Sequence, residues 1–137
     1  PDRFKRLAQR AKEIFDGTSR YSVFQFLHND AHHENILIKE EQISGIIDFG
    51  NAEYGETARE FSRYIRDFPD YFQHIVSSYE EASGRKLSFA RLVSNGFLSG
   101  FMEIVEDYRK EEKDRLNAEK MVSSYEKLMD VAFTSGI

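Results

Sequence analysis

Two short apolar runs joined by a polar turn constrain the fold of this chain more than any other feature. Residues 35–39 and 43–47 each have the length and apolar character of a strand, and residues 40–44 supply the turn between them. A tight hairpin brings the residue after its second strand back beside the start of the first. The sequence therefore predicts a β-hairpin that places Asp48 next to Asn35.

Three polar side chains lie at the outer ends of this hairpin. Asp30 precedes Asn35 by five positions, and Asp48 begins an Asp-Phe-Gly turn. Phosphoryl transfer depends on groups that position the reactants and on cations that neutralise charge. A carboxylate can orient or deprotonate a hydroxyl, and Asn and Asp oxygens suit Mg²⁺. The spacing indicates a kinase-type site, with chance polarity of a loop as the alternative.

The same residues carry a family resemblance. Residues 28–37, His-Asn-Asp-Ala-His-His-Glu-Asn-Ile-Leu, resemble the catalytic loop H-G-D-x-H-x-x-N-[IVL]-[LM] of the aminoglycoside phosphotransferases and their choline-kinase-like and homoserine-kinase-like relatives. Residues 46–50, Ile-Ile-Asp-Phe-Gly, are similar to the metal-binding turn of that family, and residues 55–62 to the start of its next helix. The resemblance covers about residues 23–64.

The resemblance implies a fold and a set of roles. The fold is α+β and predominantly α-helical: a kinase-like C-terminal lobe in which a small β-hairpin carries the catalytic loop and the Asp-Phe-Gly turn. Asp30 would be the catalytic base or hydroxyl-positioning carboxylate. Asn35 and Asp48 would bind Mg²⁺ with ATP or GTP as phosphoryl donor, and the acceptor would be a small hydroxyl-bearing molecule. Four residues would support the site structurally: His28, His32, Gly50 and Glu60.

The chain departs from the family pattern at residues that brace the loop. Asn29 stands where the family has Gly, Ala31 where it has a larger apolar residue, and Glu60 where it has Asp. The pair Glu56-Thr57 replaces Asp-Pro. None of these changes removes a metal ligand.

The segment before the motif is short. In the family, an N-terminal lobe of roughly a hundred residues binds the nucleotide, whereas here 27 residues precede His28. Pro1 is an unusual translation start and suits a fragment or a processed product. We expect residues 1–137 to form a single domain, the C-terminal lobe without its nucleotide-binding lobe, and to be inactive alone.

The rest of the chain has helical periodicity. Helices are predicted at residues 1–15, 58–65, 69–84, 88–110 and 113–133, with Ser88 as an N-cap and Gly84 as a stop. Apolar residues of the last helix are predicted to face inward: Leu116, Met121, Val122, Tyr125, Leu128, Met129 and Phe133. Gly96 and Gly100 would permit close helix packing.

Composition limits the classes of partner. The net charge of −5 argues against nucleic-acid binding and suits a cationic acceptor. Residues 103–115 hold six acids and four bases, which in relatives would help to bind amino groups and otherwise form a solvated helix end. The absence of cysteine suits the cytoplasm, and no apolar run reaches the length of a membrane span.

Several alternatives remain open at this stage. A transition-metal site could involve His28, His32, His33 and Glu34, but adjacent histidines point apart on an extended loop. Arg63 and Arg66 could contact phosphate, although a surface role is favoured. The competing function is a non-catalytic binding domain, which would form a homo-oligomer through the exposed face between lobes.

Overall fold

The computed structural model describes residues 2–134, which are mostly helical with two small antiparallel sheets, as the α+β prediction requires. Pro1 of the first predicted helix lies outside these residues. The elements are α1 (Asp2–Gly17), η1 (Ser19–Tyr21), β1 (Phe24–Leu27), η2 (His33–Asn35), β2 (Ile36–Lys39), β3 (Gln42–Ile46), β4 (Glu53–Glu56), α2 (Thr57–Asp67), η3 (Pro69–Tyr71), α3 (Phe72–Ser83), α4 (Phe89–Arg109) and α5 (Glu112–Thr134).

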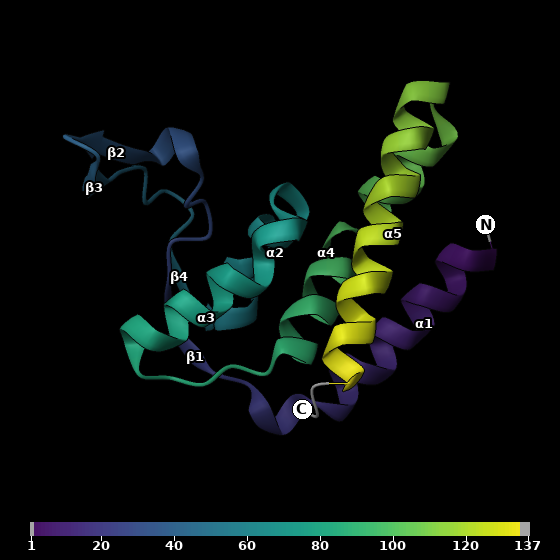
Figure 1. Cartoon of the computed structure of the whole chain (residues 1–137), viewed down its shortest axis with the longest axis horizontal. Coiled ribbons are helices and arrows are strands. Elements are labelled where there is room, and N and C mark those ends of the chain that lie inside the picture. Colours follow the sequence, from purple (N-terminus) through teal and green to yellow (C-terminus); the bar gives the residue numbers. More distant parts are fainter. Residues whose placement is uncertain (1, 135–137) are drawn as a thin grey trace.

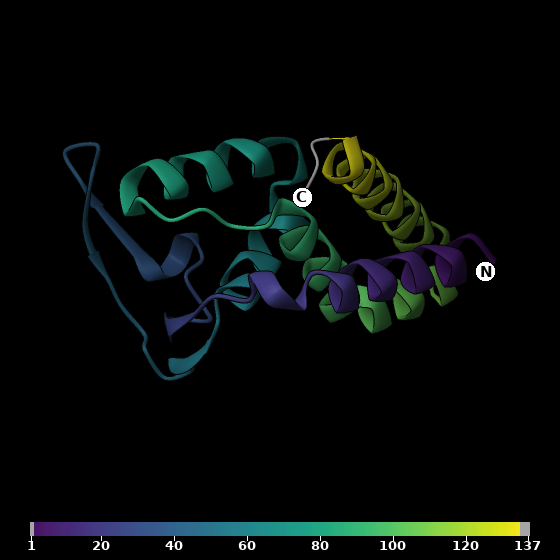
Figure 2. The same ribbon diagram turned by 90° about the horizontal axis from the view of Figure 1, so that it is seen from below.

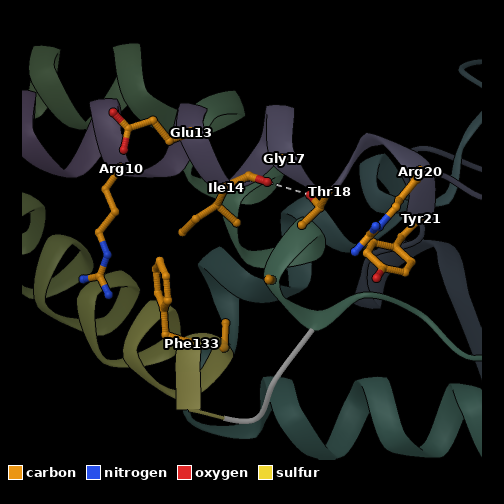
Figure 3. A pocket seen from close by; sticks show the side chains of 10 residues that line it. Arg10, Glu13, Ile14, Gly17, Thr18, Arg20, Tyr21 and Phe133 are labelled. Carbon is orange, nitrogen blue, oxygen red and sulfur yellow. Dashed lines mark hydrogen bonds between the residues drawn. The ribbon is translucent and has the colours of Figure 1, made fainter.

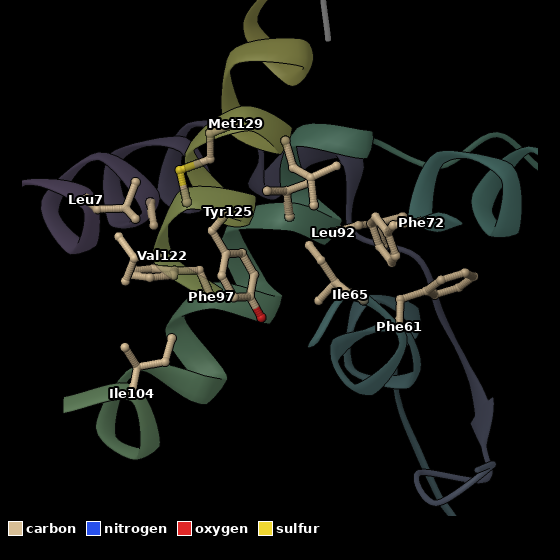
Figure 4. Close-up of a cluster of buried hydrophobic side chains, with 14 of the residues drawn as sticks. Leu7, Phe61, Ile65, Phe72, Leu92, Phe97, Ile104, Val122, Tyr125 and Met129 are labelled. Carbon is tan, nitrogen blue, oxygen red and sulfur yellow. The ribbon is translucent and has the colours of Figure 1, made fainter. Parts of the chain in front are cut away.

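The core lies between the helices. Helix α4 packs against α1, α2 and α5, and the hairpin of β2 and β3 projects away from this bundle (Figures 1 and 2). Figure 4 shows the buried side chains that meet there, from α1, α2, α3, α4 and α5. They include Leu7, Phe61, Ile65, Phe72, Leu92, Phe97, Ile104, Val122, Tyr125 and Met129. The apolar periodicity of the sequence thus becomes one continuous core.

Local signals set the helix ends. The Ser88 hydroxyl accepts a hydrogen bond from the Arg91 backbone N–H at 3.3 Å, so Ser88 is the N-cap of α4 as predicted. Gly84 ends α3 with φ of +68°, a left-handed conformation that glycine adopts without steric cost. Pro69 starts the short turn η3 rather than α3 itself, which begins at Phe72.

Two predicted inner residues of α5 are exposed, so the prediction is wrong for them. Leu116 is 56% and Phe133 59% exposed. Leu116 precedes Ala118, the first buried residue of α5, so it lies before the part of the helix that packs in the core. At the other end, the guanidinium of Arg10 covers the Phe133 ring at 4.6 Å from its centroid.

The predicted hairpin is present as β2 and β3, with Ile36 opposite Ile46 and Lys39 opposite Gln42. Its turn is shorter than predicted and consists of Glu40 and Glu41, both with positive φ. A two-residue turn of this hand matches the twist of the strands. The hairpin therefore forms although neither turn residue is a glycine.

The structure contains a second pair of strands that the sequence analysis did not predict. Strand β1 pairs antiparallel with β4, with Phe24 opposite Glu56 and Leu27 opposite Glu53. No short turn joins residues 24–27 to residues 53–56, because the whole hairpin and the Asp-Phe-Gly turn lie between them in the sequence. Local sequence patterns therefore do not indicate this pairing. This pairing fixes both ends of the predicted site, since β1 enters the loop at residue 28 and β4 leads directly into α2.

Both sheets expose apolar side chains. Phe24 and Tyr54 stack across β1 and β4 with ring centroids 6.5 Å apart, and both are more than half exposed. On the hairpin, Ile38 and Ile43 are exposed by 62% and 66%. Within residues 2–134, none of the helices combines the length and apolarity that a membrane crossing requires.

Candidate functional site

The predicted catalytic loop runs from the end of β1 to the start of β2 and is anchored by helix α2. The Oε2 atom of Glu60 accepts hydrogen bonds from the backbone N–H groups of His28, at 2.7 Å, and Asn29, at 3.1 Å. Two amides held by one carboxylate oxygen leave the loop little freedom at this point. Glu60 thus braces the loop, although its side chain is one methylene longer than the Asp of the family pattern.

Asn29 explains how the loop turns without the family's glycine. Its φ is +63°, in the left-handed region that Asn tolerates better than most residues. Its Nδ2 donates to the carbonyl oxygen of Asn51 at 3.1 Å and to Oε1 of Glu53 at 3.2 Å. The side chain therefore ties the loop to the segment that follows the Asp-Phe-Gly turn.

His28 and Asn35 together pin the residue before Asp48. The Ile47 backbone N–H donates to the Asn35 carbonyl oxygen at 3.0 Å, and the Ile47 carbonyl oxygen lies 2.8 Å from Nε2 of His28. The Nδ1 atom of His28 accepts from the Asp30 N–H at 3.2 Å, so the network assigns the ring proton to Nε2. The two ends of the hairpin meet as predicted, and His28 supports both.

Asn35 is buried at 7% exposure, and its amide group is oriented by the loop. Its Nδ2 donates to the Asp30 carbonyl oxygen at 2.9 Å and lies 3.3 Å from Asp30 Oδ2 and 3.2 Å from His32 Nε2. Because the amino half is engaged in this way, Oδ1 is the half that remains to bind a metal ion. The donor set thus fits the predicted role of Asn35.

Asp48 has an exposed carboxylate and a strained backbone, with φ of +63°. Among the described residues, its Oδ1 accepts only a long hydrogen bond, 3.4 Å, from the Gly50 N–H, and an added Cβ at Gly50 would lie 3.3 Å from that oxygen. Asn29 and Asp48 thus both hold left-handed conformations in the segments that flank the hairpin. The carboxylate is accessible to a hydrated cation.

The Asp30 carboxylate is held from the other side by Arg63 of α2. The Nη1 atom of Arg63 lies 3.0 Å from Asp30 Oδ1, and Nε2 of His32 lies 3.5 Å from the same oxygen. Arg63 is thus partly exposed, as a surface role requires, and it also contacts the loop, which the sequence analysis did not predict. Helical spacing could have indicated the contact between Arg63 and the loop, because Arg63 follows Glu60 by three positions and lies on the same face of the helix.

Tyr64 adds a further contact that the sequence reading missed. Its hydroxyl donates to the Ala31 carbonyl oxygen. Burial raises the pKa of Tyr64, and the Glu60 carboxylate raises it further. The phenol therefore stays protonated and can keep donating to the loop.

The histidine cluster considered as an alternative does not form a transition-metal site within residues 2–134. Across residues 2–134, no three His, Cys, Asp or Glu side chains gather closely enough to hold a metal ion. The predicted pair Asn35 and Asp48 would be a smaller set of ligands, of the kind that suits Mg²⁺ with water and phosphate oxygens. From the acidic run, Glu103 pairs with Arg66 at 3.1 Å.

A separate cavity of about 490 Å³ lies between the ends of α1 and α5 (Figure 3). Ile14 and Phe133 point toward its middle, and Arg10 and Arg20 lie at opposite ends. None of the residues predicted for the phosphoryl-transfer site lines it. The volume of this cavity is therefore no evidence that it takes part in phosphoryl transfer.

Comparison with known proteins gives one match. The family model described as the phosphotransferase enzyme family matches residues 1–93, which span α1 to the start of α4 and include every residue of the site described above. No curated protein and no solved structure matches the chain.

Proposed function

Because the chain belongs to the phosphotransferase enzyme family, we propose that it supplies the catalytic half of a small-molecule kinase. The reaction transfers the γ-phosphoryl group of ATP or GTP to an alcohol. The acceptor oxygen forms a bond to the γ-phosphorus, the bond to the bridging oxygen breaks, and the nucleoside diphosphate leaves. The hydroxyl proton goes to Asp30.

Each predicted residue has a part that its surroundings support. Asp30 orients the acceptor hydroxyl and takes its proton, while its own position is held by Arg63 and Asn35. Asn35, through Oδ1, and Asp48 would hold Mg²⁺, which when bound supplies positive charge against the phosphate oxygens. His28 and Glu60 keep the loop and the Asp-Phe-Gly turn together.

The observation that carries the proposal is the double anchoring of Ile47. Its N–H and C=O bind Asn35 and His28 respectively, so the segment ending in Asp48 is fixed to the loop that holds Asp30. A chance set of polar loop residues would not require hydrogen bonds that join both halves of the motif. The arrangement favours a preorganised site.

The proposal extends to the second lobe of the enzyme and to the acceptor. We infer that residues 2–134 would form the C-terminal lobe, whose motif residues bind Mg²⁺ and the phosphate groups, and that transfer also requires the family's nucleotide-binding lobe. Residues 1–137 alone would therefore bind Mg²⁺ with ATP without transferring the phosphoryl group. The acceptor is a small hydroxyl compound, and the acidic surface favours a cationic one.

Magnesium-dependent nucleotide binding tests the proposal. Thermal unfolding is measured with ATP alone, with Mg²⁺ alone and with both, for the wild type and for Asp48→Ala. We expect stabilisation by Mg²⁺ with ATP that Asp48→Ala abolishes, because a ligand stabilises the state that binds it. Glu41→Ala, at the far end of the hairpin, is the matched control for loss of one exposed acid. Equal responses of all three proteins would refute the metal site.

The exposed aromatic pair of Phe24 and Tyr54 favours one second candidate, a non-catalytic domain that binds a second copy of itself. Such a domain would show no response to Mg²⁺ with ATP, and its mass by light scattering would be twice that of the chain. A monomer of 16.0 kDa at high concentration would exclude this candidate.

A further inference from the structure

Arg63 reaches the predicted catalytic carboxylate from the helix that also anchors the loop backbone. Glu60 binds the amides of His28 and Asn29, and Arg63, one turn later on α2, binds the Asp30 side chain at 3.0 Å. Neither interaction follows from the loop motif itself. Helix α2 thus positions the backbone and side chain of the loop with two neighbouring residues.

A row of alternating charges holds the Arg63 guanidinium from behind. Its Nε lies 3.3 Å from Asp67 Oδ2, and Asp67 Oδ1 lies 3.0 Å from Nε of Arg66. The row ends with Arg66 Nη1 at 3.1 Å from Glu103 of α4. Partly exposed ion pairs contribute little stability, so the main effect of this row is to orient Arg63.

One amino group of Arg63 is left over. Nε and Nη1 are engaged, whereas Nη2 has no hydrogen-bond partner within residues 2–134. The Arg63 side chain as a whole is 40% exposed. The two N–H groups of Nη2 can still donate to the oxygens of a phosphate group, and the positive charge of the guanidinium strengthens such hydrogen bonds.

A positive side chain beside Asp30 would add to the charge that Mg²⁺ supplies. A phosphoryl group must approach Asp30, whose carboxylate repels it, and Asp48 and Glu60 add further negative charge nearby. The guanidinium bound to Asp30 is the side chain placed to offset that repulsion on the acceptor side. We propose that Arg63 binds the phosphate group being transferred, with Nη2 as donor, an inference that rests on the function proposed above.

Binding measurements on matched variants test this role. Mg²⁺ with ATP, and separately inorganic phosphate with and without Mg²⁺, are titrated into the wild-type chain and into Asp48→Ala. The dissociation constant and the arginine side-chain ¹⁵N signals are followed. For Mg²⁺ with ATP we expect Arg63→Gln to raise the dissociation constant about tenfold or more, because a charge-assisted hydrogen bond is lost. Arg63→Lys, which keeps the charge without the fork, should recover part of the loss.

Arg10→Gln is the matched control. Arg10 also pairs with an Asp at 3.0 Å and has 38% exposure, but it lies on α1 away from the loop. The dissociation constant of Arg10→Gln for Mg²⁺ with ATP should stay within about twofold of the wild-type value, since this substitution removes equal charge without touching the site. Equal losses in both variants would reduce the effect to net charge and overturn the proposal.

The outcomes separate this inference from the proposed function. If Asp48→Ala abolishes magnesium-dependent binding and Arg63→Gln changes nothing, the function stands and the role of Arg63 is refuted. If Arg63→Gln abolishes phosphate binding that depends on neither Mg²⁺ nor Asp48, the anion site stands and the kinase function falls. A wild type that binds neither probe would overturn both.

Discussion

At the scale of single residues, the loop is organised by carboxylates and amides that each make more than one contact. Glu60 accepts two backbone N–H groups, and Asn35 donates to both the backbone and the side chain of Asp30. Hydrogen bonds of this kind orient a functional group and restrict the conformations of the rest of the loop. Their removal should therefore affect loop order more than overall fold.

Glu60→Ala tests this bracing. Two partly buried amides lose a charged acceptor, so we expect the free energy of unfolding to fall by about 2 kcal/mol. Urea denaturation measures the loss, and hydrogen exchange at the His28 and Asn29 amides should accelerate. Glu34→Ala, which removes a carboxylate with 75% exposure from the same loop, should change stability by less than about 0.5 kcal/mol. Unchanged exchange in Glu60→Ala would show that the loop does not depend on this brace.

At the scale of elements, α2 is held where the site needs it by close packing on α4. A Cβ added at Gly96 of α4 would lie 2.5 Å from Cγ2 of the buried Ile65 of α2. At Gly100, one turn later, nothing lies within 4 Å. The predicted close-packing role therefore belongs to Gly96 and not to Gly100.

The two glycines make a matched pair for measurement. Gly96→Ala should lower the free energy of unfolding by about 1–3 kcal/mol, because the overpacked contact forces α2 and α4 apart. Gly100→Ala should raise it by about 0.5–1 kcal/mol through helix propensity alone. Chemical denaturation of both variants gives the comparison. The packing argument would fail if the two substitutions shifted stability in the same direction.

Arg91 connects the same elements to the start of the chain. Its guanidinium pairs with both oxygens of Glu56 at the end of β4, donates to the Phe15 carbonyl oxygen and covers the Phe15 ring at 4.1 Å. Because Glu56 is also the residue before α2, this buried cation joins α1, α4 and the anchoring helix. The site is thus attached to the bundle through α2.

At the scale of the whole molecule, stability comes from the helical core and function from the loop at its edge. Tyr125 of α5 lies in that core, 2% exposed, with its ring 5.1 Å from that of Phe97. Burial raises the pKa of Tyr125 well above its usual value of 10. In the unfolded chain the phenol ionises near pH 10, whereas in the folded chain it stays protonated.

This difference predicts a loss of stability in alkali. A folded-state pKa above the unfolded value gives stability that is present below pH 10 and declines as the pH rises beyond it. Tyr125→Phe removes the ionisable group and should flatten the decline between about pH 9.5 and 11 in unfolding free energy. Tyr71→Phe, at an exposed tyrosine, is the control and should keep the wild-type slope. If the unfolding free energy of Tyr125→Phe declined with pH as steeply as that of the wild type, groups other than Tyr125 would cause the alkaline loss of stability.

Local patterns in the sequence predicted most of the elements. Ser88 and Gly84 mark helix ends through interactions with residues a few positions away, and the hairpin follows from two adjacent apolar runs. The limits appear at Leu116 and Phe133, which keep the helical period but lie beyond the core. Periodicity indicates which face is apolar and not how far the partner surface extends.

The sequence by itself determined the family, the helices, the hairpin and the identity of the three motif residues. Only the tertiary structure decided that β1 pairs with β4 and that Arg63 binds Asp30, two contacts between segments about thirty residues apart. The physical reason is that helix and hairpin patterns depend on neighbours in the chain, whereas these contacts depend on how α2 packs on α4. That packing sets which α2 side chains face the loop, and so gives Asp30 a cationic partner.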